Sequence, residues 1–126
     1  MKIPTDPNTK SGGFGYAEAG AYKLRVKIAP ELKDGPKAQY LKWQFEFVDP
    51  NVTAVDLELT LGVIFENTTL ADAGQFRLKQ LADALGMVWG AEFDTDLAIG
   101  REFDAQVGVK AYNGKMSNEI TQYVPA

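Results

Sequence analysis

Apolar and polar side chains alternate along five segments of this chain. The segments are residues 21–29, 40–48, 55–61, 102–112 and 115–124. An alternation with a period of two residues is typical of a β-strand with one buried face and one wet face. Because every segment keeps a polar face, the pattern favours an antiparallel sheet over a parallel α/β sheet.

One segment, residues 72–85, has a helical period instead. Its apolar side chains recur at positions i, i+3, i+4 and i+7, and they are Leu78, Leu81, Ala82 and Leu85. This spacing predicts an amphipathic helix. Gly86 stands where helices often end in the left-handed conformation, and Asp72 or Thr69 is expected to cap the start of the helix.

The register of the alternation predicts which side chains form the core. The inward positions of the first strand are Tyr22, Leu24, Val26 and Ile28. In the third strand Val55, Leu57, Leu59 and Leu61 are expected inside, with Asp56, Glu58 and Thr60 outside. Trp43 is in the inward register of the second strand, so we assign it to the core. Trp89 is expected to pack against neighbouring residues of the linker, the alternative being an exposed ring that stacks.

Turn-forming residues separate the segments. Asn113-Gly114 predicts a type I′ hairpin, because both central positions of that turn need a positive φ. Residues 30–38 and 87–99 are expected to be a turn-rich loop and an irregular linker. Residues 1–20 are rich in Gly and Pro and have little apolar periodicity, which predicts a flexible N-terminal arm before a domain spanning residues 21–126.

The resulting order is three strands, one helix and two strands. This β-β-β-α-β-β order is that of an all-β domain with one helix, the five-stranded Greek-key barrel known as the OB-fold. OB-fold barrels bind oligonucleotides or oligosaccharides on the face of the second and third strands and on the loops after the first and fourth strands. We therefore ask which side chains the order places on that surface.

Composition narrows the classes of function. The 126 residues fit one domain, and the chain contains no histidine and no cysteine. It thus lacks the usual general base near neutral pH, disulfides and thiolate zinc ligands, and no phosphate-loop or nucleophile-elbow motif is present. We expect a binding protein rather than an enzyme, without a metal or cofactor. No transmembrane run or signal peptide is seen, so a cytoplasmic location is expected.

The net charge of −4 is unevenly distributed along the chain. Residues 1–50 have eight Lys/Arg and six Asp/Glu, giving +2. Residues 51–106 have three and ten, giving −7, and residues 107–126 have two and one, giving +1. The two mildly basic ends of the chain could therefore bind a polyanion even though the chain as a whole is acidic.

Three groups of side chains are candidates for binding nucleic acid. On the outward faces of the first two strands they are Lys23, Arg25, Lys27, Tyr40 and Lys42. In the final hairpin they are Lys110, Tyr112 and Lys115, and the loop after the first strand adds Lys33 and Lys37. Cations can hold phosphates, and the two tyrosine rings can stack bases. The alternative is a solvated outer face and an ordinary cross-strand pair, and Asp56 and Glu58 on the third strand would repel phosphate.

Several sequence motifs of the chain resemble those of a known group of proteins. The motifs are Gly20-Ala21-Tyr22, residues 40–46, Leu85-Gly86, and residues 99–103, 112–115, 117–120 and 123. Over about residues 20–125 the chain resembles small phage and prophage proteins regarded as single-stranded DNA-binding OB-fold proteins. The resemblance implies non-specific binding of single strands in phage DNA replication or recombination, with Lys42, Tyr112 and Lys115 in matching positions. The last residues are not acidic, so recruitment of partners through an acidic tail is in doubt.

We therefore expect a protein that coats single-stranded DNA without base specificity, with homo-oligomers and replication or recombination proteins as further partners. One alternative is a structural or adaptor OB domain of a phage assembly that does not bind nucleic acid. Another is a small nuclease whose Asp94, Asp96 and Asp104 hold magnesium, although no spacing forces these carboxylates together.

Overall fold

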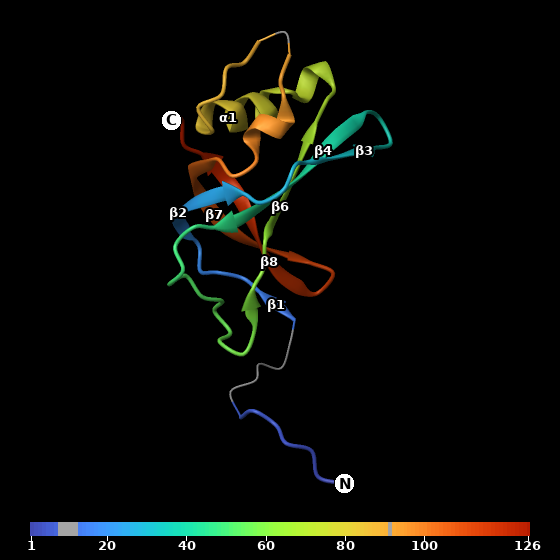
Figure 1. Ribbon diagram of the computed structural model, residues 1–126. Helices are drawn as coiled ribbons and strands as arrows, with labels where there is room; N and C mark the ends of the chain where they lie inside the picture. Colours follow the sequence, from blue (N-terminus) through green and yellow to red (C-terminus); the bar gives the residue numbers. More distant parts are fainter. Residues whose placement is uncertain (8–12, 91) are drawn as a thin grey trace.

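The structure is a computed structural model that describes residues 1–7, 13–90 and 92–126; the side chain of Tyr112 also lies outside the described part. The described chain is mostly β with one short α-helix (Figure 1). The strands are β1 (Phe14–Gly15), β2 (Gly20–Val26), β3 (Glu31–Asp34), β4 (Gln39–Phe47), β5 (Thr60–Leu61), β6 (Ile64–Thr69), β7 (Glu102–Tyr112) and β8 (Lys115–Tyr123). The helix α1 is Phe76–Ala84, and two short 3₁₀ helices are η1 (Asp72–Gly74) and η2 (Thr95–Ala98).

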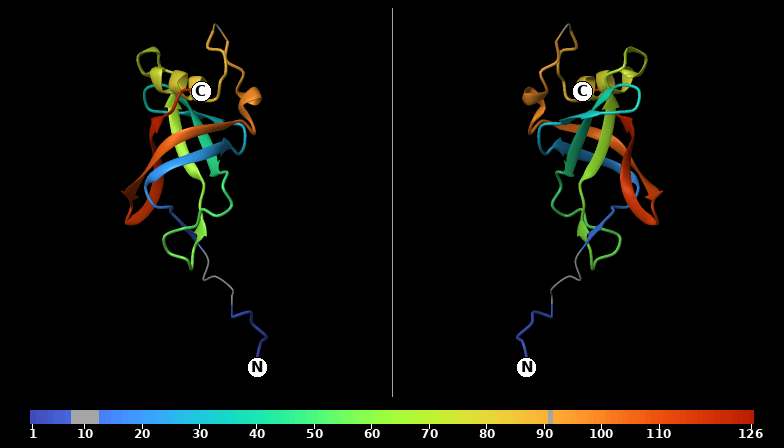
Figure 2. Two further views of the ribbon diagram at one scale, coloured as in Figure 1. Left: turned by 90° about the vertical axis from the view of Figure 1, so that its left-hand side faces the viewer. Right: turned by 90° about the vertical axis from the view of Figure 1, so that its right-hand side faces the viewer.

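The main sheet is antiparallel and has six strands. Its order is β3-β4-β2-β7-β8, and β6 pairs with β4. Strands β6 and β8 contact each other, but among the described residues no hydrogen-bonded ladder joins them. Helix α1 lies at one end of the sheet, and the N-terminus lies beyond the opposite end (Figure 2). The predicted antiparallel sheet with one helix is therefore confirmed.

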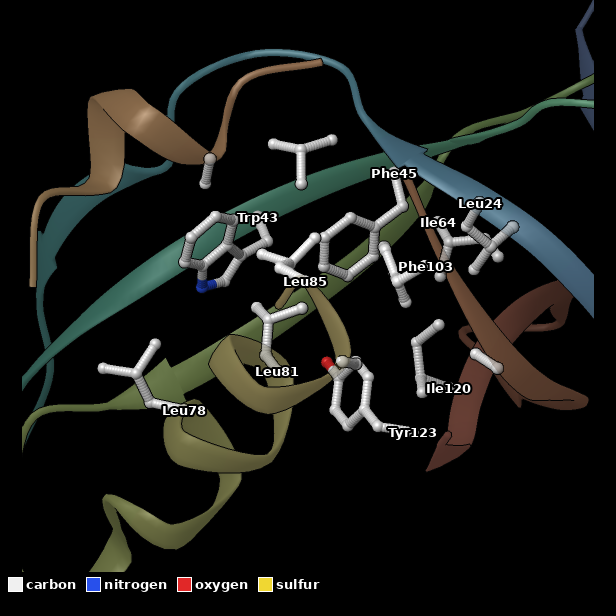
Figure 3. Close-up of a cluster of buried hydrophobic side chains, with 14 of the residues drawn as sticks. Leu24, Trp43, Phe45, Ile64, Leu78, Leu81, Leu85, Phe103, Ile120 and Tyr123 are labelled. Atoms are coloured by element: carbon white, nitrogen blue, oxygen red, sulfur yellow. The ribbon is translucent and has the colours of Figure 1, made fainter. Parts of the chain in front are cut away.

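The core lies between the curved sheet and α1 (Figure 3). Leu24, Trp43, Phe45 and Ile64 are fully buried, and Leu81 of α1 packs against them. The indole Nε1 of Trp43 donates a hydrogen bond of 2.9 Å to the hydroxyl of buried Thr68, so the polar atom of the ring is satisfied. The assignment of Trp43 to the core is confirmed. Trp89 is half-buried against the core, with its ring centroid 5.8 Å from that of Phe93, as expected.

The third strand of the prediction is wrong. Val55–Glu58 forms turns, Val55 and Leu57 are exposed, and only Thr60–Leu61 of the predicted segment is a strand. The Asp56 side chain accepts a hydrogen bond of 3.0 Å from the Glu58 N–H, and its carbonyl accepts one from the Leu59 N–H. These local bonds satisfy the backbone in a turn rather than in a ladder. The strand that takes the place of the predicted third strand is β6, at Ile64–Thr69, which pairs with β4.

Three smaller expectations are also corrected. The N-cap of α1 is Gln75, whose side chain makes no capping hydrogen bond, because Asp72 belongs to the 3₁₀ turn η1 and Thr69 to β6. The loop predicted over residues 30–38 contains β3, which forms a hairpin with β4. Ile28 is 40% exposed, because β2 ends at Val26 and the inward register ends with it.

Part of the predicted N-terminal arm is attached to the domain. Strand β1 pairs in parallel with β5, and the Gly62 N–H donates to the Gly15 carbonyl at 3.0 Å. Two residues later, Ala17 is fully buried and exchanges hydrogen bonds with the side chain of Asn118 on β8. The segment Gly13–Ala17 thus lies against the end of the sheet that is far from α1 (Figure 1). Within the described residues, no helix is long and apolar enough to cross a membrane.

Tyr123 offers a test of the packing between α1 and the sheet. Its hydroxyl is buried and has no hydrogen-bond partner among the described residues. We expect Tyr123→Phe to raise the free energy of unfolding at pH 8 by about 1 kcal/mol, because an unsatisfied buried hydroxyl is removed. Urea denaturation followed by circular dichroism measures the change. A loss of stability of similar size would show that the hydroxyl has a partner.

The same variant tests a dependence on pH. Burial raises the pKa of the Tyr123 hydroxyl well above its usual value; the Glu66 carboxylate adds to this effect and the Arg77 guanidinium opposes it. Above about pH 10 the unfolded chain loses this proton and the folded chain keeps it, so Tyr123 lowers stability as the pH rises, by about 1.4 kcal/mol per unit. The stability gained with Tyr123→Phe should therefore be larger at pH 11 than at pH 8.

Candidate nucleic-acid interface

Two members of the predicted cationic stripe on β2 are paired with carboxylates. Lys23 Nζ lies 3.3 Å from Asp104 Oδ1 on β7, and Arg25 Nε lies 2.8 Å from Glu46 Oε1 on β4. In each case the two residues are direct cross-strand neighbours. Both cations are thereby neutralised locally, and a phosphate would have to compete with a carboxylate for each of them. The stripe does not act as one continuous cationic row.

The cations predicted in the first loop lie in and beside the β3–β4 hairpin. Lys33 Nζ lies 2.9 Å from Glu31 Oε2, and this ion pair lowers the pKa of the Glu31 carboxyl and raises the pKa of the Lys33 ammonium. Lys37 is exposed in the turn. Among the described residues, Lys37 is therefore the one cation of this loop that is not in an ion pair.

The outer face of β4 and β6 combines a ring with a cation. Lys42 Nζ lies 4.8 Å from the centroid of the Phe65 ring, and Phe65 is 48% exposed. Gln44 is the direct cross-strand neighbour of Phe65, and half-buried Tyr40 lies further along the same face of β4. An exposed ring beside an ammonium group can stack a base and hold its phosphate.

The β7–β8 hairpin has the predicted turn. Asn113 and Gly114 have φ values of 49° and 76°, and Tyr112 pairs with Lys115 across the strands. Lys110 and Lys115 are exposed and form no ion pair with a described carboxylate. The side chain of Tyr112, predicted to stack bases, lies outside the described part of the structure.

A groove of about 970 Å³ lies between the β7–β8 hairpin and the outer face of β4 and β6. The hairpin lines it with Asn113 and residues 115–118, and β4, β6 and the end of β2 line it with Gln44, Phe65 and Lys27. The segment Gly13–Gly15 and residues 60–63 complete the lining. Among the described lining residues are two lysines and no Asp or Glu, although the chain as a whole has a net charge of −4. The groove is thus a locally positive site on an acidic protein.

The structure brings some predicted residues together and separates others. Lys27 and Lys115, which are far apart in the sequence, line one groove, and Lys42 reaches Phe65 in its wall. The predicted repulsion of phosphate by Asp56 and Glu58 does not apply to the groove. Both residues are exposed in the loop between β4 and β5, and neither of them lines the groove.

Sequence reasoning missed two exposed rings of the groove, Phe14 and Phe65. Phe65 was missed because the third strand was placed at residues 55–61, although the β-branched residues between Val63 and Thr69 were a signal for the correct strand. Phe14 was assigned to a flexible arm. Its only signal was a large apolar side chain in a Gly-rich segment.

The carboxylates of the nuclease alternative have other interactions. Asp94 Oδ1 accepts a hydrogen bond of 3.0 Å from the Asp96 N–H at the start of η2, and Asp104 pairs with Lys23. Three or more potential ligands do not meet at any point in the described part of the chain. The structure therefore gives the nuclease alternative no support.

Comparison with known proteins identifies the family of this chain. No curated protein matches this chain. A family model described as "Protein of unknown function (DUF669)" matches residues 3–126, which includes the sheet, the helix and the groove. The chain therefore belongs to the DUF669 family.

Proposed function

We propose that this protein binds single-stranded DNA, without base specificity, in the groove between the β7–β8 hairpin and the outer face of β4 and β6. The observation that supports this most is the lining of the groove, in which lysines and exposed rings occur without carboxylates. Lysines bind phosphates, and aromatic rings stack on the faces of unpaired bases. Neither kind of contact distinguishes one base from another, so no sequence preference is expected.

We further propose that the sheet is an OB-fold barrel formed by β2, β4, β6, β7 and β8. In support, each of these strands pairs with or contacts its neighbours in a ring, since β6 contacts β8, and α1 covers one end. The groove then lies where OB-folds bind oligonucleotides, between the second and third strands and the loop after the fourth. The setting in phage replication or recombination, in the host cytoplasm, rests on the sequence resemblance alone.

A titration tests the proposed function. Fluorescein-labelled oligo-dT should bind at about 50 mM salt, and its affinity should fall steeply at about 200 mM salt. Phe65→Ala should weaken binding by about 5- to 30-fold, which corresponds to about 1–2 kcal/mol and lies within the range for one stacked base. Phe76→Ala is a matched control, because this ring is also exposed but lies on α1. Absence of binding at the lower salt concentration would refute the proposal.

One observation favours the alternative of an adaptor domain. Val55 and Leu57 are 55% and 69% exposed, and together with Val52 and Tyr22 they line a second concave surface. Exposed apolar side chains of this kind are found at protein interfaces. If Val55→Ser and Leu57→Ser abolish an assembly of this protein and oligo-dT does not bind, the adaptor function is the better account.

A further inference from the structure

We infer that the segment Gly13–Ala17 is a fixed wall of the DNA-binding groove and that Phe14 stacks an unpaired base there. This inference rests on the proposed function and deepens it. Phe14 lines the groove together with Lys27 and Lys115 of the elements predicted to bind DNA, although it belongs to the predicted arm.

The side chain of Asn118 anchors the segment. Its Oδ1 accepts a hydrogen bond of 2.7 Å from the Ala17 N–H, and its Nδ2 donates to the Ala17 carbonyl at 2.9 Å. Nδ2 also donates to the Gly108 carbonyl of β7 at 3.1 Å. Asn118 is 7% exposed and Ala17 is fully buried, so water competes little for these bonds. The side-chain amide thus pairs with the segment as a neighbouring strand would.

Close packing fixes the other half of the segment. A Cβ atom at Gly15 would lie 2.9 Å from the Cβ of Ala54 and 3.1 Å from that of Leu59, so only glycine allows this approach. The Gly15 carbonyl accepts a hydrogen bond from the Gly62 N–H, and Phe14 is opposite Thr60 in the β1–β5 pair. The backbone on both sides of Phe14 is therefore held in place.

The Phe14 ring is exposed on this fixed backbone. It is 78% exposed, although its own residue is in a strand and its neighbour Gly15 is half-buried. An exposed ring on an ordered backbone loses little conformational entropy when it makes a contact, since only its side-chain torsions are still free. The ring shares the groove with Lys27, Lys115 and Phe65, and no described carboxylate lines it.

The chemistry of this lining selects single strands. The flat faces of bases are covered by their neighbours in a duplex, whereas an unpaired base offers both faces to an aromatic side chain. The two lysines provide charge for the phosphates on either side of such a base. We therefore expect the groove to prefer a single strand over a duplex of the same length.

Substitutions of Phe14 test the inference with labelled oligo-dT as the probe. Phe14→Ala and Phe14→Leu should each weaken binding by about 5- to 30-fold. Phe14→Trp should bind about as tightly as the wild type, because stacking needs an aromatic face. A second probe of the same length with abasic sites should bind weakly, and Phe14→Ala should not weaken it further. The melting temperature of the variants should be close to that of the wild type, because the ring is exposed.

The outcomes separate this inference from the proposed function. If Phe14→Ala binds oligo-dT as tightly as the wild type while Phe65→Ala binds more weakly, the inference is wrong and the proposed function stands. The inference is also wrong if Phe14→Ala weakens binding of the abasic probe as much as it weakens binding of oligo-dT, because the contribution of the ring would then not depend on a base. If wild-type protein does not bind oligo-dT at about 50 mM salt, the proposed function fails, and the inference fails with it.

Discussion

The double variant Lys27→Glu, Lys115→Glu is expected to lose about 30- to 100-fold of its affinity for oligo-dT at low salt, because two phosphate contacts become repulsive. The two lysines line one groove, Lys27 directly after β2 and Lys115 in the β7–β8 hairpin. A strand that follows the groove passes both of them. The slope of log affinity against log salt should also become shallower, by about 1.4 for two phosphates of a single strand.

A control with the same change in net charge separates contact from long-range attraction. Lys2 and Lys79 are exposed and do not line the groove. The variant Lys2→Glu, Lys79→Glu should therefore change the affinity only slightly, and both proteins should melt at temperatures near that of the wild type. An equal loss of affinity in both double variants would mean that total charge, and not the groove, governs binding.

The elements that were predicted correctly are those with strong local signals. Asn113-Gly114 allows the positive φ values of its turn, and this fixes the register of β7 and β8 from the turn to Val107, where a bulge shifts it. Strand β7 begins and ends at the predicted residues, and Gly86 has the expected φ of 69° after α1. In each case the residues that cause the structure are adjacent in the sequence.

The third strand was misplaced because its signal is not local. Residues 55–61 alternate perfectly, but alternation cannot distinguish a strand from an exposed loop whose turns are stabilised by Asp56. In β6 the inward residue Thr68 is polar, and its burial depends on a hydrogen bond to Trp43, which is 25 residues away. A pattern of hydrophobicity alone counts such a threonine as a surface residue.

The candidate site was only partly predictable for a similar reason. A period of two residues showed which cations face outward, but it could not show that Asp104 and Glu46 lie opposite Lys23 and Arg25. These pairs depend on the alignment of strands that are distant in the sequence. The same limit concealed Phe14, whose place in the groove depends on Asn118, at a separation of 101 residues from Ala17.

The second large effect is expected at Arg77, which bonds to both β6 and β8, two strands that no hydrogen-bonded ladder joins among the described residues. Arg77 extends from α1, and its Nε lies 3.0 Å from Glu66 Oε1 on β6 while its Nη2 donates to the Ile120 carbonyl on β8 at 2.7 Å. Its guanidinium carbon also lies 4.7 Å from the centroid of the Tyr123 ring. The Arg77 side chain therefore connects α1 to both β6 and β8.

Arg77→Met is expected to lower the free energy of unfolding by about 2–3 kcal/mol, because methionine keeps the apolar stem but removes both hydrogen bonds. Glu66, whose side chain is 14% exposed, would keep a poorly hydrated charge without its partner. This expected loss of stability is smaller than the loss for a fully buried ion pair, because the side chain of Arg77 is 25% exposed. Urea denaturation at pH 7 measures the change.

Lys79→Met is the matched control on the same helix. Lys79 is exposed, and within the described part of the chain it pairs only with Asp83 one turn away, a contact worth about 0.3–0.5 kcal/mol. A double-mutant cycle with Glu66→Gln then isolates the contact between Arg77 and Glu66, since glutamine keeps a hydrogen-bond acceptor without the charge. If Arg77→Met costs no more stability than Lys79→Met, contacts between the strands themselves must hold β6 and β8 together. If it costs more and also weakens binding of oligo-dT, the bond network of Arg77 helps to set the distance between Phe65 on one wall of the groove and the hairpin on the other.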